Sequence, residues 1–223
     1  MKKNLLASFA ILLSSIAISY SQDTVRIKHT NYVTVYSKSL KYPVLVEWWE
    51  TKAKVACVTP LPRKDQFAPD PLLPFETDLQ KGYDQINKQH KLAGTKGVDR
   101  GHMCPAASNE CEGAKVLTEC FYFSNMAPQF HSLNAGNWKS LETLERQLAL
   151  QNDSVHVWAG SLGELERVGS VSIPKQCWKV VYVSKTKEYL AYIFDNNSNK
   201  PDGLNSHKVD VDYLSKLTGY KFN

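Results

Sequence analysis

Runs of β-branched and aromatic residues, several with apolar and polar positions alternating, predict strands near both ends of the chain. Three such runs lie at residues 25–27, 32–36 and 44–49, and three more at residues 155–160, 178–184 and 189–194. A period of two in residues of this kind is typical of a half-buried strand. These runs therefore predict a sheet.

A helical period appears in the segment from Asn134 to about Gln151. Its apolar positions recur at spacings of three and four, at Trp138, Leu141, Leu144 and Leu148. This spacing gives one apolar stripe, and asparagine is a common residue at helix N-termini. A short helix is also expected within the polar segment 78–97, and a second one at residues 209–217.

The middle of the chain holds a proline-rich loop and two further strand patterns. Five prolines between Pro60 and Pro74 exclude regular structure there, and we expect a long ordered loop that is either functional or a cover over the core. Residues 98–103 and the aromatic run within 116–126 predict strands, and Pro128 predicts a turn before the helix. No repeat or linker interrupts the pattern. The fold class expected is α+β, with a central mainly antiparallel sheet flanked by helices.

The first 21 residues have the pattern of a secretory signal peptide. Lys2 and Lys3 precede an apolar run from Leu5 to Ile18, and small residues follow up to Ser21. A membrane anchor is the alternative, but the run is shorter than the roughly 20 residues that span a bilayer. We expect cleavage near Ser21, a single domain over residues 22–223, export to the periplasm or the medium, and no stable membrane association after cleavage.

Composition narrows the function classes only slightly. The chain of 223 residues is 43% hydrophobic and 22% charged, which suits one ordinary globular domain. Without Lys2 and Lys3 it carries 25 basic and 22 acidic residues, a net charge of +3. That balance permits a polyanionic substrate held in a local basic groove but lacks the strong basic bias of many nucleic-acid-binding domains.

Five cysteines lie at positions 57, 104, 111, 120 and 177. In an exported protein they predict up to two disulfides and one odd thiol, with the pairing left open. A cysteine-ligated zinc is disfavoured because the sequence has no Cys-x-x-Cys pair.

The polar residues between 98 and 146 match the requirements of phosphodiester hydrolysis with one metal ion. His102 suits a general base, and Asn134 can offer a carbonyl oxygen to Mg²⁺. Glu142 could hold metal-bound water, while Arg100 and Arg146 could clamp phosphate oxygens.

Each of these residues also has a structural interpretation. The histidine could be a satisfied core residue, Asn134 a helix cap, and Glu142 with Arg146 an exposed ion pair. Asp99 could anchor a turn. For His131, a role in the loop or helix entry is favoured over an approach to the metal, and no role is assigned to His29, His90, His156 and His207.

The order of the motifs resembles the DNA/RNA non-specific endonuclease family, the ββα-metal group that includes endonuclease G. The resemblance rests on Asp99-Arg100-Gly101-His102-Met103 with Pro105, on Ser124-Asn125-Met126-Ala127-Pro128-Gln129, and on Leu133-Asn134, Trp138 and Leu141-Glu142. It is weaker but continuous from Trp48 to Phe194. It implies a ββα-metal finger formed by the His102 strand, the Phe121 strand and the helix after Asn134.

The resemblance also implies a role for each site residue. His102 would be the general base, Asn134 the direct ligand of Mg²⁺, and Glu142 the residue that positions metal-bound water. Arg100 would lie near the scissile phosphate, Arg146 would contact phosphate, and Arg63 would be the loop arginine that stabilises the transition state. Asn125 would support the site. Mn²⁺ or Ca²⁺ would also suit one amide ligand with several waters. Two positions depart from the family, namely Cys104 after His102-Met103 and Ala135, where many members carry glutamine.

The function implied is a secreted, Mg²⁺-dependent endonuclease that cleaves DNA and RNA with little sequence preference and leaves 5′-phosphate ends. Trp48, Trp49 and Tyr83 could stack on single-stranded bases or serve as packing residues. Two alternatives stay open, an exported polyanion- or protein-binding member without turnover and a phosphodiesterase for small nucleotides or lipids. The sequence distinguishes neither DNA from RNA preference nor a monomer from a homodimer.

Overall fold

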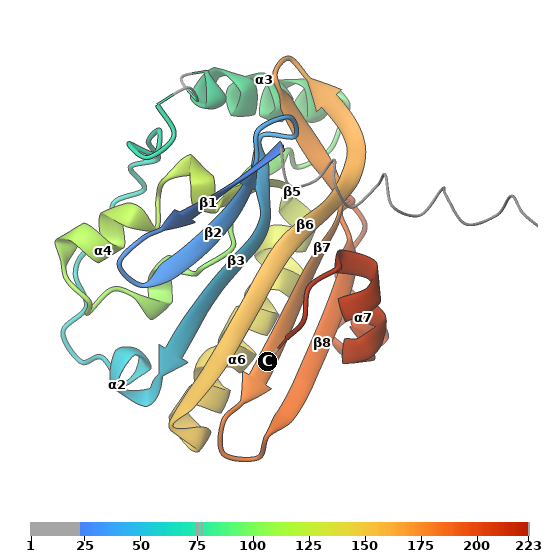
Figure 1. Cartoon of the computed structure of the whole chain (residues 1–223). Coiled ribbons are helices and arrows are strands. Elements are labelled where there is room, and N and C mark those ends of the chain that lie inside the picture. Colours follow the sequence, from blue (N-terminus) through green and yellow to red (C-terminus); the bar gives the residue numbers. More distant parts are fainter. Residues whose placement is uncertain (1–22, 75, 77, 223) are drawn as a thin grey trace, which may run out of the picture.

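The computed structural model describes residues 23–74, 76 and 78–222, so the signal peptide predicted at residues 1–21 lies outside the described part (Figure 1). The strands are β1 (Thr24–Lys28), β2 (Tyr32–Ser37), β3 (Tyr42–Thr51), β4 (Val98–His102), β5 (Met126–Phe130), β6 (Ser154–Val168), β7 (Val171–Val183), β8 (Glu188–Asp195) and β9 (Lys208–Val209). The helices are α2 (Lys52–Val55), α3 (Leu79–Leu92), α4 (Ala114–Glu119), α5 (His131–Leu133), α6 (Lys139–Asn152) and α7 (Val211–Thr218). Short turns are η1 (Ala106–Ser108), η2 (Phe123–Asn125), η4 (Asn205–His207) and the π-helical η3 (Asn134–Trp138).

Seven strands form one antiparallel sheet in the order β1-β2-β3-β6-β7-β8-β9, and β4 pairs with β5 in a separate two-stranded sheet. The six strands predicted from the ends of the chain are all present in the large sheet. The predicted α+β class with a mainly antiparallel central sheet is therefore confirmed.

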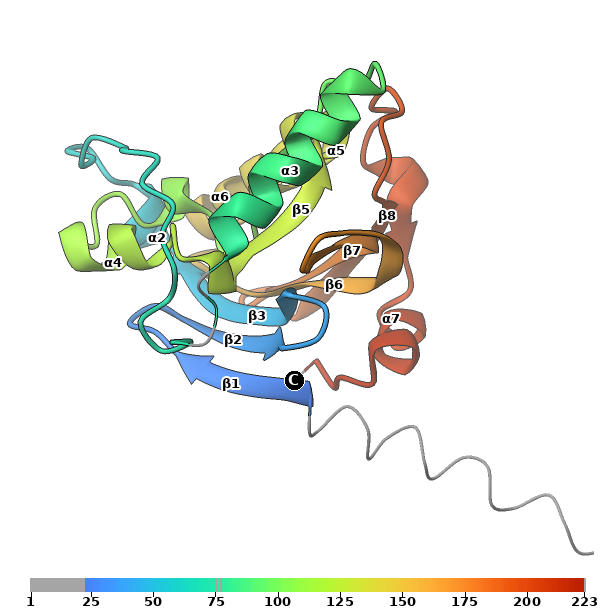
Figure 2. The same ribbon diagram turned by 90° about the horizontal axis from the view of Figure 1, so that it is seen from above.

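The large sheet is covered on both faces (Figure 2). Alternate residues of the central strands point to opposite sides, so Val157 and Val181 join the core beneath α6, while Trp158 and Val180 join the core beneath α7. The stripe predicted on the helix is confirmed, since Trp138 and Leu141 are buried in the first core. Among the described residues no helix combines the length and apolarity needed to cross a bilayer.

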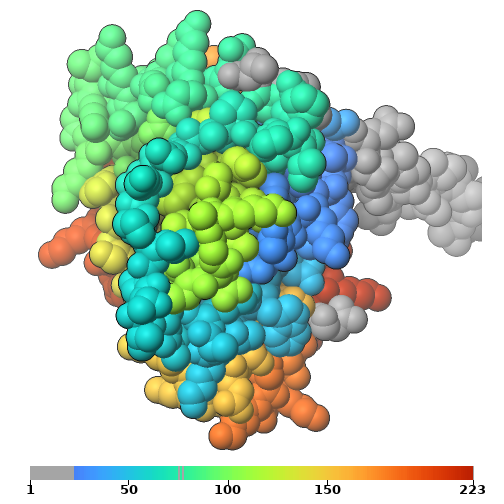
Figure 3. All heavy atoms as spheres, turned by 90° about the vertical axis from the view of Figure 1, so that its left-hand side faces the viewer, coloured from blue at the N-terminus to red at the C-terminus, as the bar shows by residue number. Residues whose placement is uncertain are grey.

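Residues 52–153 form one excursion between two neighbouring strands. β3 ends at Thr51, which pairs directly with Ser154 at the start of β6, and the Lys52 amide donates to the Asp153 carbonyl at 2.7 Å. The excursion contains the proline-rich loop, α3, the β4–β5 pair, α4 and α6. Figure 3 shows the proline-rich loop as a teal ridge that curves around the light-green surface near α4.

Three local predictions are wrong. Residues 114–119 form helix α4, and the second finger strand is β5, which includes Pro128 where a turn was expected. Phe121 and Phe123 are buried, at 2% and 1% exposure, but neither lies in a strand. The aromatic run therefore reflects burial in the core and not strand structure. Asn134 is no N-cap, since its backbone is already helical at φ −59° and ψ −52° and α6 begins at Lys139.

Candidate active site

The finger is assembled from β4, β5 and the helical segment that follows. β4 runs antiparallel to β5, with His102 opposite Met126. The Trp138 indole Nε1 donates to the His102 carbonyl at 2.9 Å, which ties the start of the helix to the end of the strand. Gly101 is required here, because a Cβ at this position would lie 2.0 Å from Oε1 of Gln129. The ββα arrangement is confirmed, with β5 in place of the Phe121 strand.

A cleft of about 460 Å³ lies over this finger. Six of the seven predicted site residues line it, namely Arg63, Arg100, His102, Asn134, Glu142 and Arg146. The lining also includes Lys139, Asp99 and His131, so cations outnumber carboxylates around the cleft. The arrangement suits a polyanion with a cation-binding position among the carboxylate and amide oxygens.

His102 is buried against two aromatic rings. Its ring centroid lies 5.0 Å from that of Phe121, edge to face, and 5.8 Å from that of Phe67. Burial, reinforced by the charge of Arg63, lowers the pKa of His102 to about 3. Its Nε2 is buried without a hydrogen-bond partner among the described residues. The imidazole is therefore neutral near pH 7 and has an unused nitrogen, as a general base requires.

Asn134 is held by the carboxylate of Asp99. The amide Nδ2 of Asn134 donates to Oδ2 of Asp99 at 2.9 Å, and Nδ1 of His131 lies 2.9 Å from the same oxygen. No described residue donates to the amide oxygen of Asn134, which is thereby left for a ligand. A free amide oxygen beside a carboxylate is the donor set that Mg²⁺ takes, so these residues fit the predicted metal. No cluster of three His, Cys, Asp or Glu side chains suited to a metal occurs in the described chain.

The three arginines reach the cleft from different elements. Nη2 of Arg100, on β4, pairs with Asp84 of α3 at 2.7 Å, and its guanidinium lies 5.2 Å from the Phe67 ring centroid. Arg63, half exposed on the proline-rich loop, pairs with Asp65 at 2.7 Å. Arg146 donates from Nη2 to the Thr143 hydroxyl at 3.2 Å.

The buried Nε of Arg100 and Nη1 of Arg146 have no hydrogen-bond partner among the described residues. Buried donors are normally satisfied. Two such guanidinium groups in one cleft therefore point to an anionic ligand.

Glu142 projects from α6 into the cleft above a buried charged cluster. Burial raises its pKa, while the charges of Lys179 and Arg146 oppose that rise. Beneath it the Lys179 ammonium lies 2.7 Å from the Glu145 carboxylate and 4.3 Å from the Trp138 ring centroid. Burial raises the pKa of Glu145 to about 8, against the lowering effect of Lys179. This cluster was missed by sequence reasoning, because Lys179 comes from β7 and Glu145 read as an ordinary polar helix residue.

Asn125, the seventh predicted site residue, lies below the cleft and is not among the residues that line it. It is fully buried, its Oδ1 accepts from the Cys104 amide, and its Nδ2 donates to the carbonyls of Cys104 and Cys120, each at 2.9 Å. It therefore holds the chain after His102 against the end of α4.

The three aromatic residues considered for base stacking also lie outside the cleft lining. Trp48 and Tyr83 are core residues, at 3% and 2% exposure. Trp49 is 46% exposed, but it stacks on His156 of the large sheet.

The cysteines form one disulfide, Cys57–Cys111, which joins the segment just before the proline-rich loop to the loop before α4. Cys104, Cys120 and Cys177 are buried free thiols. Up to two disulfides and one odd thiol were predicted, and the structure has one disulfide, which includes neither Cys104 nor Cys120.

A second polar cluster has the residue types of a nucleophilic triad but the wrong geometry. Nε2 of His29 lies 2.9 Å from Asp70, and the Ser124 hydroxyl donates to the same Asp70 oxygen. Serine and aspartate would have to contact opposite ring nitrogens for His29 to relay a proton, whereas both approach Nε2. The cluster anchors the proline-rich loop to η2.

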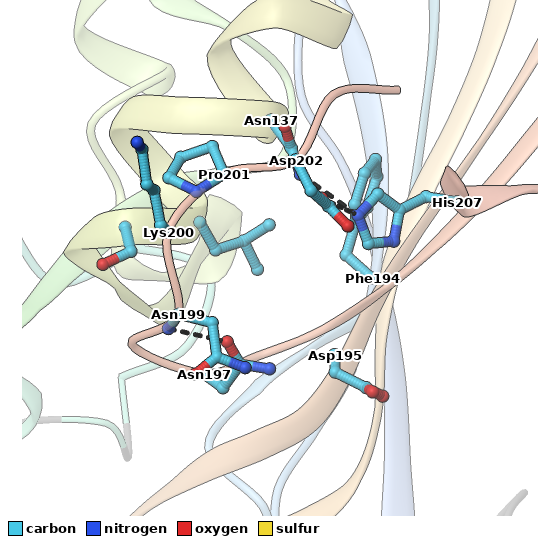
Figure 4. A pocket seen from close by; sticks show the side chains of 11 residues that line it. Asn137, Phe194, Asp195, Asn197, Asn199, Lys200, Pro201, Asp202 and His207 are labelled. Atoms are coloured by element: carbon cyan, nitrogen blue, oxygen red, sulfur yellow. Dashed lines mark hydrogen bonds and ion pairs between the residues drawn. The ribbon is translucent and has the colours of Figure 1, made fainter. Parts of the chain in front are cut away.

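A smaller hollow of about 210 Å³ adjoins η3 (Figure 4). Asp202 accepts hydrogen bonds from Asn137 at 3.0 Å and from His207 at 2.6 Å. Gly136 has no room for a Cβ, which would lie 2.3 Å from Pro201. Through these contacts the loop after β8 packs against η3, which holds the backbone that carries Asn134 in place.

Comparison with known proteins agrees with this geometry. The model of the DNA/RNA non-specific endonuclease family matches residues 13–223. A nuclease of Serratia marcescens is 35% identical over 67% of the chain and 58% of its own length, and a Nostoc nuclease is 30% identical over 72% and 60%. The chain thus spans about three fifths of the length of these relatives.

A solved structure titled as an EndoG/EndoGI complex matches with a TM-score of 0.77 at 23% identity, over 96% of this chain and 93% of that one. At this identity the match shows a shared fold. With the family match over nearly the whole chain and the ββα finger in place, the chain belongs to the DNA/RNA non-specific endonuclease family.

Proposed function

We propose that the protein is an exported, Mg²⁺-dependent endonuclease that hydrolyses phosphodiester bonds in DNA and RNA. The observation that carries this proposal is the convergence of neutral His102, oriented Asn134 and three arginines on one cleft. Family membership and relatives named as nucleases support it.

In the proposed reaction His102 is the general base. Its unused ring nitrogen takes a proton from water as the water oxygen attacks phosphorus. The bond to the 3′ oxygen breaks and that oxygen takes a proton from a second water molecule, which gives 5′-phosphate and 3′-hydroxyl ends. Asn134 would hold the divalent cation through its amide oxygen, and Glu142 would hold water beside it. The cation supplies Lewis-acid stabilisation of charge on the phosphate and leaving oxygens.

The arginines explain low sequence preference. The unpartnered donors of Arg100 and Arg146 suit phosphate oxygens, and half-exposed Arg63 on the proline-rich loop also lines the cleft and can reach the phosphate. Contacts to phosphate position a nucleic acid but carry no base information. Both DNA and RNA are therefore expected as substrates.

Export is supported by the pattern of residues 1–21 and by the Cys57–Cys111 disulfide, since structural disulfides persist in oxidising compartments. A periplasmic or extracellular location fits both. Mn²⁺ is expected to substitute for Mg²⁺ at the amide oxygen.

The test is nicking of supercoiled plasmid and cleavage of a structured RNA by the protein lacking residues 1–21. We expect turnover in Mg²⁺, none in excess chelator, and a loss of at least about 100-fold in His102→Ala, the usual scale for a general base. His156→Gln, on β6 and outside the cleft lining, is the matched control and should keep full activity. Full activity of His102→Ala would refute the mechanism. Binding of plasmid without cleavage would favour a binding protein, and turnover of small diesters alone would favour a small-molecule phosphodiesterase.

A further inference from the structure

One carboxylate oxygen organises two cleft residues. Oδ2 of Asp99 lies 2.9 Å from Nδ1 of His131 and 2.9 Å from Nδ2 of Asn134. The two partners are three residues apart in a continuous helical segment, so they lie on the same helix face. Both also line the cleft above β4.

This shared contact decides which atoms are left for a ligand. Because a carboxylate only accepts, Nδ1–H of His131 donates to Asp99, and the other ring nitrogen, Nε2, is the one left to carry a lone pair for a ligand. In the same way Asn134 gives its amide hydrogen to Asp99 and keeps its oxygen free. Histidines that bind a metal through one ring nitrogen usually donate a hydrogen bond from the other ring nitrogen to a carboxylate, a backbone carbonyl or water.

The exposure of His131 argues against a purely structural role. Its side chain is 41% exposed, and among the described residues the contact with Asp99 is its one hydrogen-bonded partner. The Asp99 contact fixes one side of a half-exposed ring that lines the cleft, so the rest of the ring is available to a ligand.

We propose that Nε2 of His131 is a second protein ligand, together with the amide oxygen of Asn134, for the divalent cation. The inference rests on the proposed function and names the metal class that this site takes. One imidazole nitrogen in place of a water shifts preference from Mg²⁺ toward Mn²⁺, Co²⁺ and Ni²⁺, because imidazole favours transition metals and Mg²⁺ favours oxygen. Asp99 acts as a positioning residue for both ligands.

The experiment uses Mn²⁺ itself as the probe, in protein without substrate. Pulsed electron paramagnetic resonance should detect the nitrogen coupling of a directly bound imidazole in the wild type and should lose it in His131→Ala. Calorimetric titration should show about tenfold or greater weakening of Mn²⁺ binding in His131→Ala, with less than about threefold change for Mg²⁺. Asp99→Asn should weaken Mn²⁺ binding by about 10–100-fold, the usual effect of losing such a supporting carboxylate.

His156→Gln is the matched control, a histidine also paired with a carboxylate, that of Glu47 at 3.1 Å, but outside the cleft lining, and it should leave the spectrum unchanged. Circular dichroism checks that His131→Ala is folded. Absence of nitrogen coupling in the wild type, or its persistence in His131→Ala, would overturn the inference. So would unchanged Mn²⁺ affinity with a raised KM for DNA, since that would assign His131 to substrate. In each of these cases plasmid nicking in Mg²⁺ would still stand, whereas failure of all nicking would refute the proposed function separately.

Discussion

The ammonium of Lys179 lies 2.7 Å from the carboxylate of Glu145, and both side chains have no exposed surface. Burial raises the pKa of Glu145 to about 8, so above that pH both groups are charged, their attraction offsets the cost of burial, and removing one partner leaves the other uncompensated. We predict that at pH 9 Lys179→Met lowers the free energy of unfolding by about 3–5 kcal/mol. Urea denaturation followed by tryptophan fluorescence measures this, with Lys185→Met on the hairpin after β7 as the exposed control.

The double variant Lys179→Met/Glu145→Leu separates the two contributions. Because it removes both buried charges, it should recover most of the stability lost in the single variant. Equal loss in the single and double variants would show that the contact of the ammonium with the Trp138 ring, and not the charge pair, is responsible.

Burial of His102 makes stability depend on pH. The pKa of His102 in the folded state is about 3, below the 6.5 of an unfolded histidine, so between these values the unfolded state binds more protons. Stability contributed by His102 is thus present above pH 6.5 and is lost as pH falls. Between pH 7.5 and 5 the loss should be about 2 kcal/mol.

The measurement is urea denaturation of the wild type and of His102→Asn at both pH values. Glu145, with its pKa raised to about 8, contributes the opposite slope, but it is present in both proteins and cancels in the difference. The same pH slope in the two proteins would contradict the burial of an uncharged His102.

Loss of Asn125 should act through stability. Asn125→Ala deletes three buried hydrogen bonds and leaves the backbone groups of Cys104 and Cys120 without partners. Each lost bond should lower the free energy of unfolding by about 1 kcal/mol or more. We expect a free energy of unfolding lower by about 3 kcal/mol in urea denaturation. Asn199→Ala, an exposed asparagine, should change it by less than about 0.5 kcal/mol. A fully stable Asn125→Ala that is inactive would instead place Asn125 in the chemistry.

The Cys57–Cys111 disulfide should contribute stability by constraining the unfolded chain. It closes a loop with a sequence separation of 54, for which the chain-entropy relation gives about 4 kcal/mol at 25 °C. Cys57→Ser/Cys111→Ser should therefore lower the free energy of unfolding by about 2–4 kcal/mol. Reductant should destabilise the wild type similarly and leave the double variant unaffected. If reductant also weakened the double variant, another cysteine pair would have to be involved.

The sequence indicated the sheet well because β-branched runs such as residues 32–36 and 155–160 carry a local signal that burial reinforces. The aromatic run at Phe121 gave a wrong strand prediction, because large apolar side chains are buried in any kind of element. Here the rings are buried although the backbone that carries them is not a strand. Asn134 misled for a related reason. A residue that caps helices well is also a good oxygen donor, and its place one turn inside a helical segment depends on η3.

The site was predictable where the motif itself is local and unpredictable where partners are distant. His102, Asn134 and Glu142 could be named from spacing, but the bond from Asn134 to Asp99 spans 35 positions in sequence. The Glu145–Lys179 pair likewise joins α6 to β7. Nothing local to either residue indicates its partner, because such contacts exist only once the excursion has packed on the sheet.

The placement of residues 52–153 between β3 and β6 also determines when a working site can exist during folding. Strands β3 and β6 are adjacent in space, but they can pair only when residues 52–153 have been closed into a loop. The chain loses conformational entropy in this closure before the β3–β6 contacts can stabilise it. The apolar stripe of helix α6 is fully buried only after that closure, because it packs against β3 as well as β6 and β7. A newly made chain therefore carries every residue of the cleft without the cleft itself.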